Sequence, residues 1–123
     1  MQAFFIGSSA QKRDLLNKEV YQELEQFYCS FFSNIYNELN IAKYKHIRDA
    51  IGLVMRKFDA CDHPLAYTGK LVMYIQGQLA LNHLQLTKQQ RQLLHKLADQ
   101  TKNINLNFVY SGPLTDAHQF SSI

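Results

Sequence analysis

Apolar residues recur at steps of three and four along four stretches of this chain, which is the spacing of one face of an α-helix. The first stretch predicts a helix over residues 14–39. Its apolar stripe contains Leu16, Val20, Leu24, Phe27, Tyr28, Phe31, Ile35 and Leu39. Neither Pro nor Gly interrupts this helix, and Asn40 is a plausible C-terminal stop.

Three further helices are predicted over residues 42–61, 64–84 and 88–103. Pro64 disfavours helical backbone in His63 and suits the first turn of the helix that follows. Thr87 and Gln90 have the spacing of a capping box at the start of the last helix. Four helices joined by short links predict an all-α fold, an antiparallel up-down-up-down four-helix bundle, in a single domain of residues 1–123.

The third predicted helix is apolar on two sides, and the second side contains Met73, Tyr74, Leu81 and Leu84. Such a helix is either central in its bundle or covered by a partner. A C-terminal tail, residues 105–123, is polar but carries Leu106, Phe108, Val109, Tyr110, Leu114 and Phe120. Large apolar side chains in a polar tail either pack back onto the bundle or await a partner. We expect partial docking, with the last residues loose.

Composition argues against several classes of protein. Hydrophobic residues make up 46% of the 123 residues, as in ordinary globular proteins, so the chain as a whole is not of the disordered class. The net charge of +3 is too small to indicate nucleic-acid binding by itself. No apolar run approaches the ~18 residues of a membrane-spanning helix. The apolar cluster at residues 3–6 is too short for a secretory signal, so we expect a cytoplasmic protein. Cys29 and Cys61 form no CxxC pair, and a disulfide between them is not favoured.

The sequence gives little evidence of catalytic or metal-binding residues. Asp59, Cys61, Asp62 and His63 are residue types that suit zinc, but their spacing matches no closed site. Asp62 more simply caps the helix that follows. The sequence shows no nucleophile beside a base and no glycine-rich phosphate loop. We therefore predict no catalytic residue, no cofactor and no metal site, and a protein that is not an enzyme.

A basic stripe lies on the outer side of the fourth predicted helix and contains Lys88, Arg91, His95 and Lys102. It is either a solvated helix face or a surface that attracts an acidic partner or the anionic inner leaflet of a membrane. The short link at residues 85–86 could also form a helix-turn-helix, so a small DNA-binding regulator is the alternative function. With a net charge of +3 we expect no nucleic-acid partner.

Residues 63–103 carry an ordered series of short features. They are Pro64 before the third helix, then Leu71, Val72, Tyr74 and Ile75, then Gln78-Leu79-Ala80, then Leu86-Thr87 and the Gln-x-x-Leu-Leu-x-x-Leu run from Gln90 to Leu97. In this order the segment resembles the immunity proteins of pediocin-like (class IIa) bacteriocins. The resemblance covers about a third of the chain, and elsewhere only the helical layout agrees.

The resemblance implies a cytosolic four-helix bundle that protects its cell from a pore-forming peptide and has no enzymatic activity. It implies a partner, the mannose phosphotransferase permease with bound bacteriocin, which the immunity protein engages to block the pore. Specificity in that family resides largely in the C-terminal half. We therefore expect a recognition surface formed by Lys88, Arg91, His95, Lys102, Phe108 and Tyr110, in a monomer that also contacts the inner leaflet peripherally.

Overall fold

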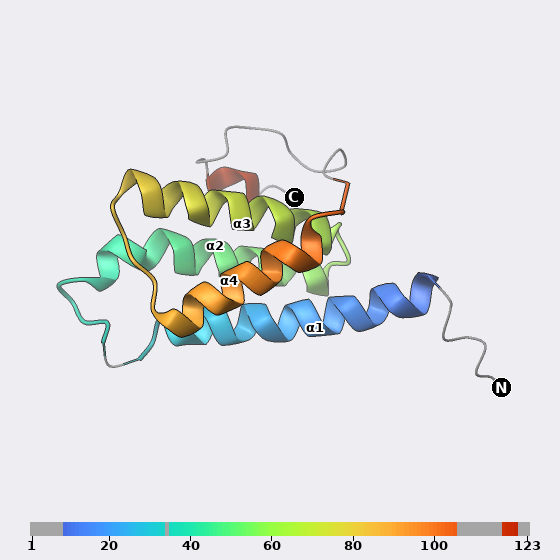
Figure 1. The fold of residues 1–123 in the computed structure, drawn as a ribbon, viewed down its shortest axis with the longest axis horizontal. Coiled ribbons are helices and arrows are strands. Elements are labelled where there is room, and N and C mark those ends of the chain that lie inside the picture. The colour runs from blue at the N-terminus through green and yellow to red at the C-terminus, as the bar shows by residue number, and fades with distance from the viewer. Residues whose placement is uncertain (1–8, 34, 106–116, 121–123) are drawn as a thin grey trace.

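In the part of the chain that the structure describes, the fold consists of four α-helices and a short 3₁₀ helix (Figure 1). The computed structural model describes residues 9–33, 35–105 and 117–120, and no strand occurs among them. The elements are α1 (Ser9–Ser30), α2 (Ile41–Asp59), α3 (Pro64–Leu81), α4 (Lys88–Thr101) and η2 (Ala117–Phe120). Consecutive helices run in opposite directions, and α1 packs against both α2 and α4. The predicted all-α, antiparallel four-helix bundle is confirmed.

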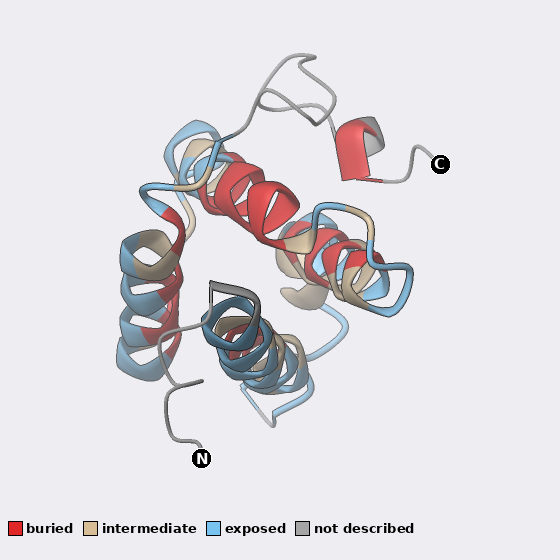
Figure 2. Ribbon diagram, turned by 90° about the vertical axis from the view of Figure 1, so that its right-hand side faces the viewer, coloured by how far each residue is buried: buried red, intermediate tan, exposed pale blue. Residues whose placement is uncertain are grey.

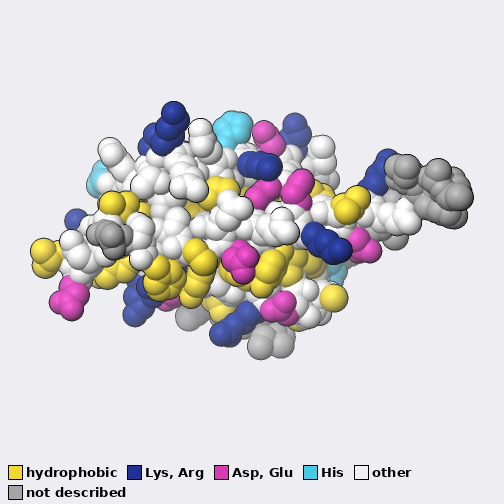
Figure 3. Space-filling model, turned by 90° about the horizontal axis from the view of Figure 1, so that it is seen from below, with side chains coloured by type: hydrophobic (Ala, Val, Ile, Leu, Met, Phe, Trp, Pro, Cys, Tyr) yellow, Lys and Arg dark blue, Asp and Glu magenta, His cyan; other side chains and the backbone are white. Residues whose placement is uncertain are grey.

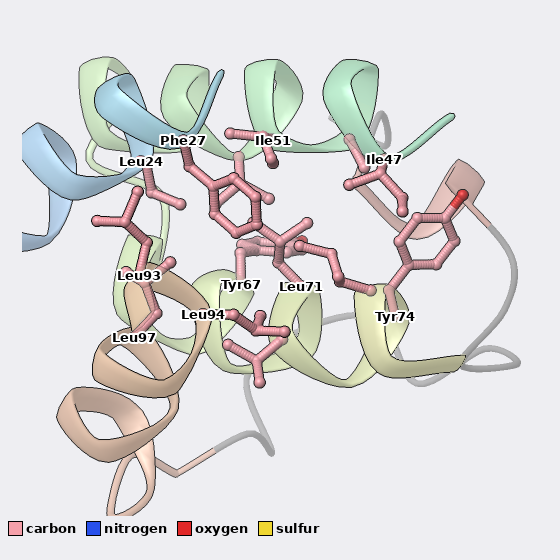
Figure 4. Close-up of a cluster of buried hydrophobic side chains, with 14 of the residues drawn as sticks. Leu24, Phe27, Ile47, Ile51, Tyr67, Leu71, Tyr74, Leu93, Leu94 and Leu97 are labelled. Carbon is pink, nitrogen blue, oxygen red and sulfur yellow. The ribbon is translucent and has the colours of Figure 1, made fainter. Parts of the chain in front are cut away.

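The core lies on the bundle axis, where the buried sides of the four helices meet (Figures 2 and 4). Its fully buried large side chains include Leu24, Phe27, Ile47, Ile51, Leu71, Ile75 and Leu97. These residues belong to the apolar stripes found in the sequence, and each stripe removes one helix face from water. Burial of apolar surface is the main force that holds such helices together.

The first helix ends nine residues earlier than the predicted boundary at residue 39, because the connection to α2 makes hydrogen bonds of its own. Oδ1 of Asn37 accepts from the backbone amides of Leu39 and Asn40, and Oδ1 of Asn40 accepts from the amide of Asn37. Short amide side chains compete in this way with helical backbone bonds. The predicted stripe therefore stops at Phe31, while Ile35 and Leu39 are exposed.

The ends of α2 and α3 also precede the predicted residues 61 and 84. Cys61 and His83 adopt left-handed backbone, with φ of 53° and 54°. The next amides reach back, from Asp62 to the carbonyl of Lys57 and from Leu84 to the carbonyl of Leu79. This is the Schellman type of helix end, usually made with glycine. The fourth helix ends at Thr101 rather than residue 103, with Lys102 as its C-cap.

The capping box at the start of α4 is confirmed and extends further than predicted. Thr87 Oγ1 accepts from the amide of Gln90 at 3.2 Å, and Oε1 of Gln90 accepts from the amide of Thr87 at 3.0 Å. The side-chain nitrogen of Gln90, Nε2, also donates to Ser30 Oγ and to the Tyr36 hydroxyl, each at 2.9 Å. Gln90 therefore ties the start of α4 to the end of α1.

An ion pair between the buried Glu23 and the exposed Lys96 joins α1 to α4. Glu23, which is 5% exposed, accepts from Lys96 Nζ at 3.0 Å and from Gln100 Nε2 at 3.1 Å. The hydrogen bond from Lys96 to this carboxylate raises the pKa of Lys96. The contacts of Oε2 with Lys96 and Gln100 offset part of the cost of burying this carboxylate. No helix of the described residues is long and apolar enough to cross a membrane.

Candidate functional site

The basic stripe predicted from the sequence forms one exposed face of α4. Lys88, Arg91, His95 and Lys102 are all exposed, and their spacing places them on the side opposite the buried Leu93 and Leu97. His95 lies 3.5 Å from the carboxylate of Asp99 one turn later, and both side chains are more than half exposed. An exposed pair of this kind contributes little to stability, so it is free to exchange for contacts with a partner.

Arg91 differs from Lys88, His95 and Lys102 because it already has a structural role. Its Nη1 donates to the carbonyl of Leu86 at 2.7 Å. On the neighbouring residue, the carbonyl of Gln85 accepts from the Tyr44 hydroxyl at 3.0 Å. The α3–α4 connection is thus held from both sides, which fixes the shape of the surface next to it.

An open groove of about 770 Å³ lies between α3 and α4 on this side of the bundle. Its lining combines apolar residues with a polar rim: Leu79, Leu84, Leu86, Leu94 and Ala98, then Gln76, Gln85, Arg91, His95 and Asp99. A concave apolar surface with a few polar groups at its edge is typical of a binding site. We call these ten residues the α3–α4 groove.

The groove contains two of the predicted recognition residues, Arg91 and His95, while Lys88 and Lys102 lie on the same helix face outside its lining. Its apolar lining was predicted only in part. Leu84 belongs to the second apolar side of the third predicted helix, whereas Leu79, Leu86, Leu94 and Ala98 were not predicted as site residues. The sequence therefore did not predict that these residues meet in one groove.

The described part of the tail packs onto α2 and α3 (Figures 2 and 4). Phe120 of η2 is 1% exposed, and its ring meets that of Tyr74 edge to face, with centroids 5.4 Å apart. The predicted partial docking of the tail is confirmed at this residue. It covers part of the second apolar side of α3, whereas Met73 and Leu81 stay exposed. Phe108 and Tyr110 lie outside the described residues.

Of the four residues whose types suit zinc, Asp62 and His63 contact each other, and Asp62 also contacts a lysine. Asp62 lies 3.2 Å from His63 Nδ1 and 3.4 Å from Lys57 Nζ, and the hydrogen bond from His63 is the main cause of its lowered pKa. The predicted cap is wrong: His63 is the N-cap of α3, with no side-chain hydrogen bond, and Asp62 precedes it. Within the described ranges, no three His, Cys, Asp or Glu residues form a metal-binding group.

Lys57, which contacts Asp62, is itself buried. It is 6% exposed, and its ammonium group lies 4.4 Å from the centre of the Tyr67 ring. Contact with the ring face and with Asp62 compensates the buried charge. Cys29 and Cys61 are both exposed free thiols.

Comparison with known proteins identifies a family for most of the chain. Residues 17–102 match the model of the bacteriocin immunity protein family, a span that runs from the first helix to the end of the fourth. No curated protein matches the chain, and no solved structure does. The match covers more than half of the sequence and agrees with the helical bundle. The chain belongs to the bacteriocin immunity protein family.

Proposed function

We propose that this protein is a cytoplasmic immunity protein that protects its cell from a pore-forming, pediocin-like bacteriocin. The family match over residues 17–102 is the observation that carries the proposal. The finer identification rests on the resemblance of residues 63–103 to the pediocin-like group. The protein acts by binding, and no chemical step is part of its action.

The proposed partner is the mannose phosphotransferase permease with the bacteriocin bound to it. The immunity protein engages this complex from the cytoplasmic side and prevents the lethal opening of the pore. In this way the small protein needs no affinity for free bacteriocin outside the cell. Binding only the loaded receptor means that its affinity for the loaded state exceeds that for the empty state.

The contact surface that we propose consists of the α3–α4 groove and the basic face of α4. The groove supplies apolar surface for an inserted side chain or helix, Lys88 and Lys102 supply positive charge at its side, and His95 supplies a polar ring at its rim. Interfaces of this composition have an apolar centre and a polar rim. Phe108 and Tyr110, from the adjoining tail, remain part of the proposed surface.

The helix-turn-helix alternative is less well supported. The family match favours immunity. In addition, α3 ends at Leu81 and α4 begins at Lys88, so six residues connect them, whereas a helix-turn-helix has a turn of about three or four. Gln90, in the first turn of α4, is 1% exposed and is used for packing against α1 rather than for reading bases.

Isolation of the receptor complex tests the proposed mechanism. Permease is captured from membranes of a sensitive strain that expresses the immunity protein, with and without added bacteriocin. We expect the immunity protein to be recovered with the permease only when bacteriocin is present. Equal recovery in both samples, or none in either, would contradict binding to the loaded receptor. A groove variant, Ala98→Arg, should abolish recovery, and Lys18→Ala on the exposed side of α1 is the control.

A further inference from the structure

The connection between α1 and α2 exposes large apolar side chains at one end of the bundle. Phe32 is 60% exposed, Ile35 56% and Leu39 89%. We call these three residues the apolar tip. Figure 3 shows hydrophobic side chains reaching the left-hand end of the molecule, where this connection lies in Figure 1. Exposed apolar patches mark sites where a protein binds another protein or a membrane.

The tip is held outward by an ordered scaffold behind it. Phe31, Tyr36 and Tyr44 point inward and pack as a ring cluster, with centroids 5.2 to 6.1 Å apart. The Tyr36 and Tyr44 hydroxyls are hydrogen-bonded to Gln90 and to the carbonyl of Gln85. Phe31 is buried, and the half-buried rings of Tyr36 and Tyr44 pack against the core, so these three rings occupy the inner side of the connection and of the first turn of α2.

The backbone of the tip is also suited to a water-poor environment. Several of its polar groups are bonded within the connection: the carbonyl of Ile35 accepts from Asn40 Nδ2, and the Asn37 and Asn40 amides are capped by side chains. Backbone groups that enter a lipid interface need such internal partners, because an unpaired group there is costly.

Positive charge lies directly behind the tip. Lys43 and Lys45 are exposed in the first turns of α2, and the Arg48 guanidinium lies 5.3 Å from the centre of the Phe32 ring. Glu38 is the nearest opposing charge in the connection, and Asp49 pairs with Arg48. Apolar side chains in front of long cationic ones match the layers of an anionic membrane, with acyl chains below the phosphates.

We propose that the apolar tip docks this protein on an anionic lipid surface. Phe32, Ile35 and Leu39 enter the boundary between acyl chains and headgroups, while Lys43 and Lys45 contact lipid phosphates. The α3–α4 connection lies at the same end of the bundle, because Tyr44 and Tyr36 reach it from the α1–α2 side. Docking at this tip places the α3–α4 groove near the membrane.

Tryptophan fluorescence tests the insertion, because the natural chain contains no Trp. Leu39→Trp places a single indole at the tip, and Leu15→Trp places one at an exposed leucine near the opposite end of α1. On addition of phosphatidylglycerol–phosphatidylcholine vesicles, we expect the emission of Leu39→Trp to move to shorter wavelength and that of Leu15→Trp to stay unchanged. No shift at Leu39→Trp, or equal shifts in both, overturns the proposal.

Cosedimentation with the same vesicles gives a second readout. The triple variant Phe32→Ser, Ile35→Ser, Leu39→Ser should lose on the order of tenfold or more in vesicle binding, since it removes the apolar contacts. Its thermal unfolding should stay close to that of the natural protein, because all three side chains are more than half exposed. Leu15→Ser is the matched control. Undiminished binding by the triple variant overturns the proposal.

Two further experiments distinguish lipid from other binding partners of the apolar tip. Lys43→Gln combined with Lys45→Gln should weaken binding to vesicles that contain phosphatidylglycerol, and added salt should weaken the natural protein likewise. If the tip instead joins two copies of the chain, the triple variant lowers the sedimenting mass without vesicles, which overturns lipid docking. The vesicles contain no protein, so these results do not depend on the proposed receptor.

Discussion

The hydroxyl of Tyr36 lies 2.9 Å from Nε2 and 3.1 Å from Oε1 of Gln90, a residue 54 positions later in the chain. This contact joins the α1–α2 connection to the capping box of α4. Gln90 is almost fully buried, so its amide depends on protein partners rather than on water. One side chain therefore sets both the start of α4 and the path of the connection that carries the apolar tip.

Removal of this contact should lower stability. Tyr36→Phe deletes the hydroxyl and leaves the amide of Gln90 with fewer partners, so we expect a loss of about 1–2 kcal/mol in the free energy of unfolding. Urea unfolding followed by circular dichroism measures it. Tyr28→Phe is the matched control, since its half-buried ring lies on α1 without a corresponding contact. Equal losses in the two variants would contradict a specific role for Tyr36.

The left-handed residues at two helix ends predict stabilising substitutions. His83 and Cys61 have φ near 54°, where a Cβ atom is unfavourable and glycine is not. We expect His83→Gly and Cys61→Gly each to raise the free energy of unfolding by about 0.5–1 kcal/mol. Asn82→Gly, at an ordinary φ of −105°, should bring no gain. A lower melting temperature for His83→Gly would speak against the left-handed helix end.

The contacts of Asp62 with His63 and Lys57 predict a loss of protein stability in acid. His63 and Lys57 lower the pKa of Asp62 in the folded protein, so the folded state binds this proton less readily than the unfolded state. The stabilisation is complete above the unfolded pKa of about 3.9 and is lost as the pH falls through the folded pKa. Asp62 is 42% exposed, so we expect at most about 1 kcal/mol.

Comparison of the natural protein with Asp62→Asn measures this effect. Urea unfolding of both proteins at a series of pH values should show the natural protein to be more stable near neutral pH. The difference should shrink as the pH falls below about 4. A difference that does not change with pH would mean that the carboxylate charge is not the source of the stabilisation.

The proposed recognition surface predicts losses of protection without losses of folding. Lys88→Ala, His95→Ala and Lys102→Ala change exposed side chains, so thermal unfolding should be nearly unchanged. Each should weaken protection of a sensitive strain by roughly fivefold, the effect of about 1 kcal/mol at an interface. Phe108→Ala and Tyr110→Ala should weaken protection by a similar factor. Arg91→Ala should also lower stability, because Arg91 holds the carbonyl of Leu86.

The controls for this series carry the same chemical change elsewhere. Lys18→Ala on α1 and His46→Ala on α2 alter exposed residues outside the α3–α4 groove and the basic face of α4. They should protect as well as the natural sequence. If all the surface variants also protect fully, recognition takes place on another part of the molecule.

The bundle could be predicted from the sequence because burial decides it. Residues such as Leu24, Ile51 and Leu97 recur at helical spacing, and all of them are in the core. The helix ends were predicted less well. The apolar spacing continues through Ile35 and Leu39, but the hydrogen bonds of Asn37 and Asn40 end the helix before them. The spacing of apolar residues alone does not reveal that side-chain hydrogen bonds compete with the backbone hydrogen bonds of the helix.

The candidate site was predicted only in part for a related reason. The exposed face of α4 follows from helical geometry, so Lys88, Arg91 and His95 could be placed together in advance. The groove lies beside the end of α3, and left-handed backbone at a residue other than glycine, such as His83, is uncommon, so the apolar spacing did not indicate where this helix ends. The contact of Gln90 with Tyr36 joins segments far apart in the chain and could not be seen in either one.

Survival of a sensitive strain tests the central claim most directly. The protein is expressed in the cytoplasm of a strain that carries the mannose phosphotransferase permease, and the cells are challenged with a panel of pediocin-like bacteriocins. The account predicts survival against at least one of these peptides and no protection against a pore-forming peptide that does not use this permease. Full sensitivity to every pediocin-like peptide, with the folded protein present in the cells, would contradict it.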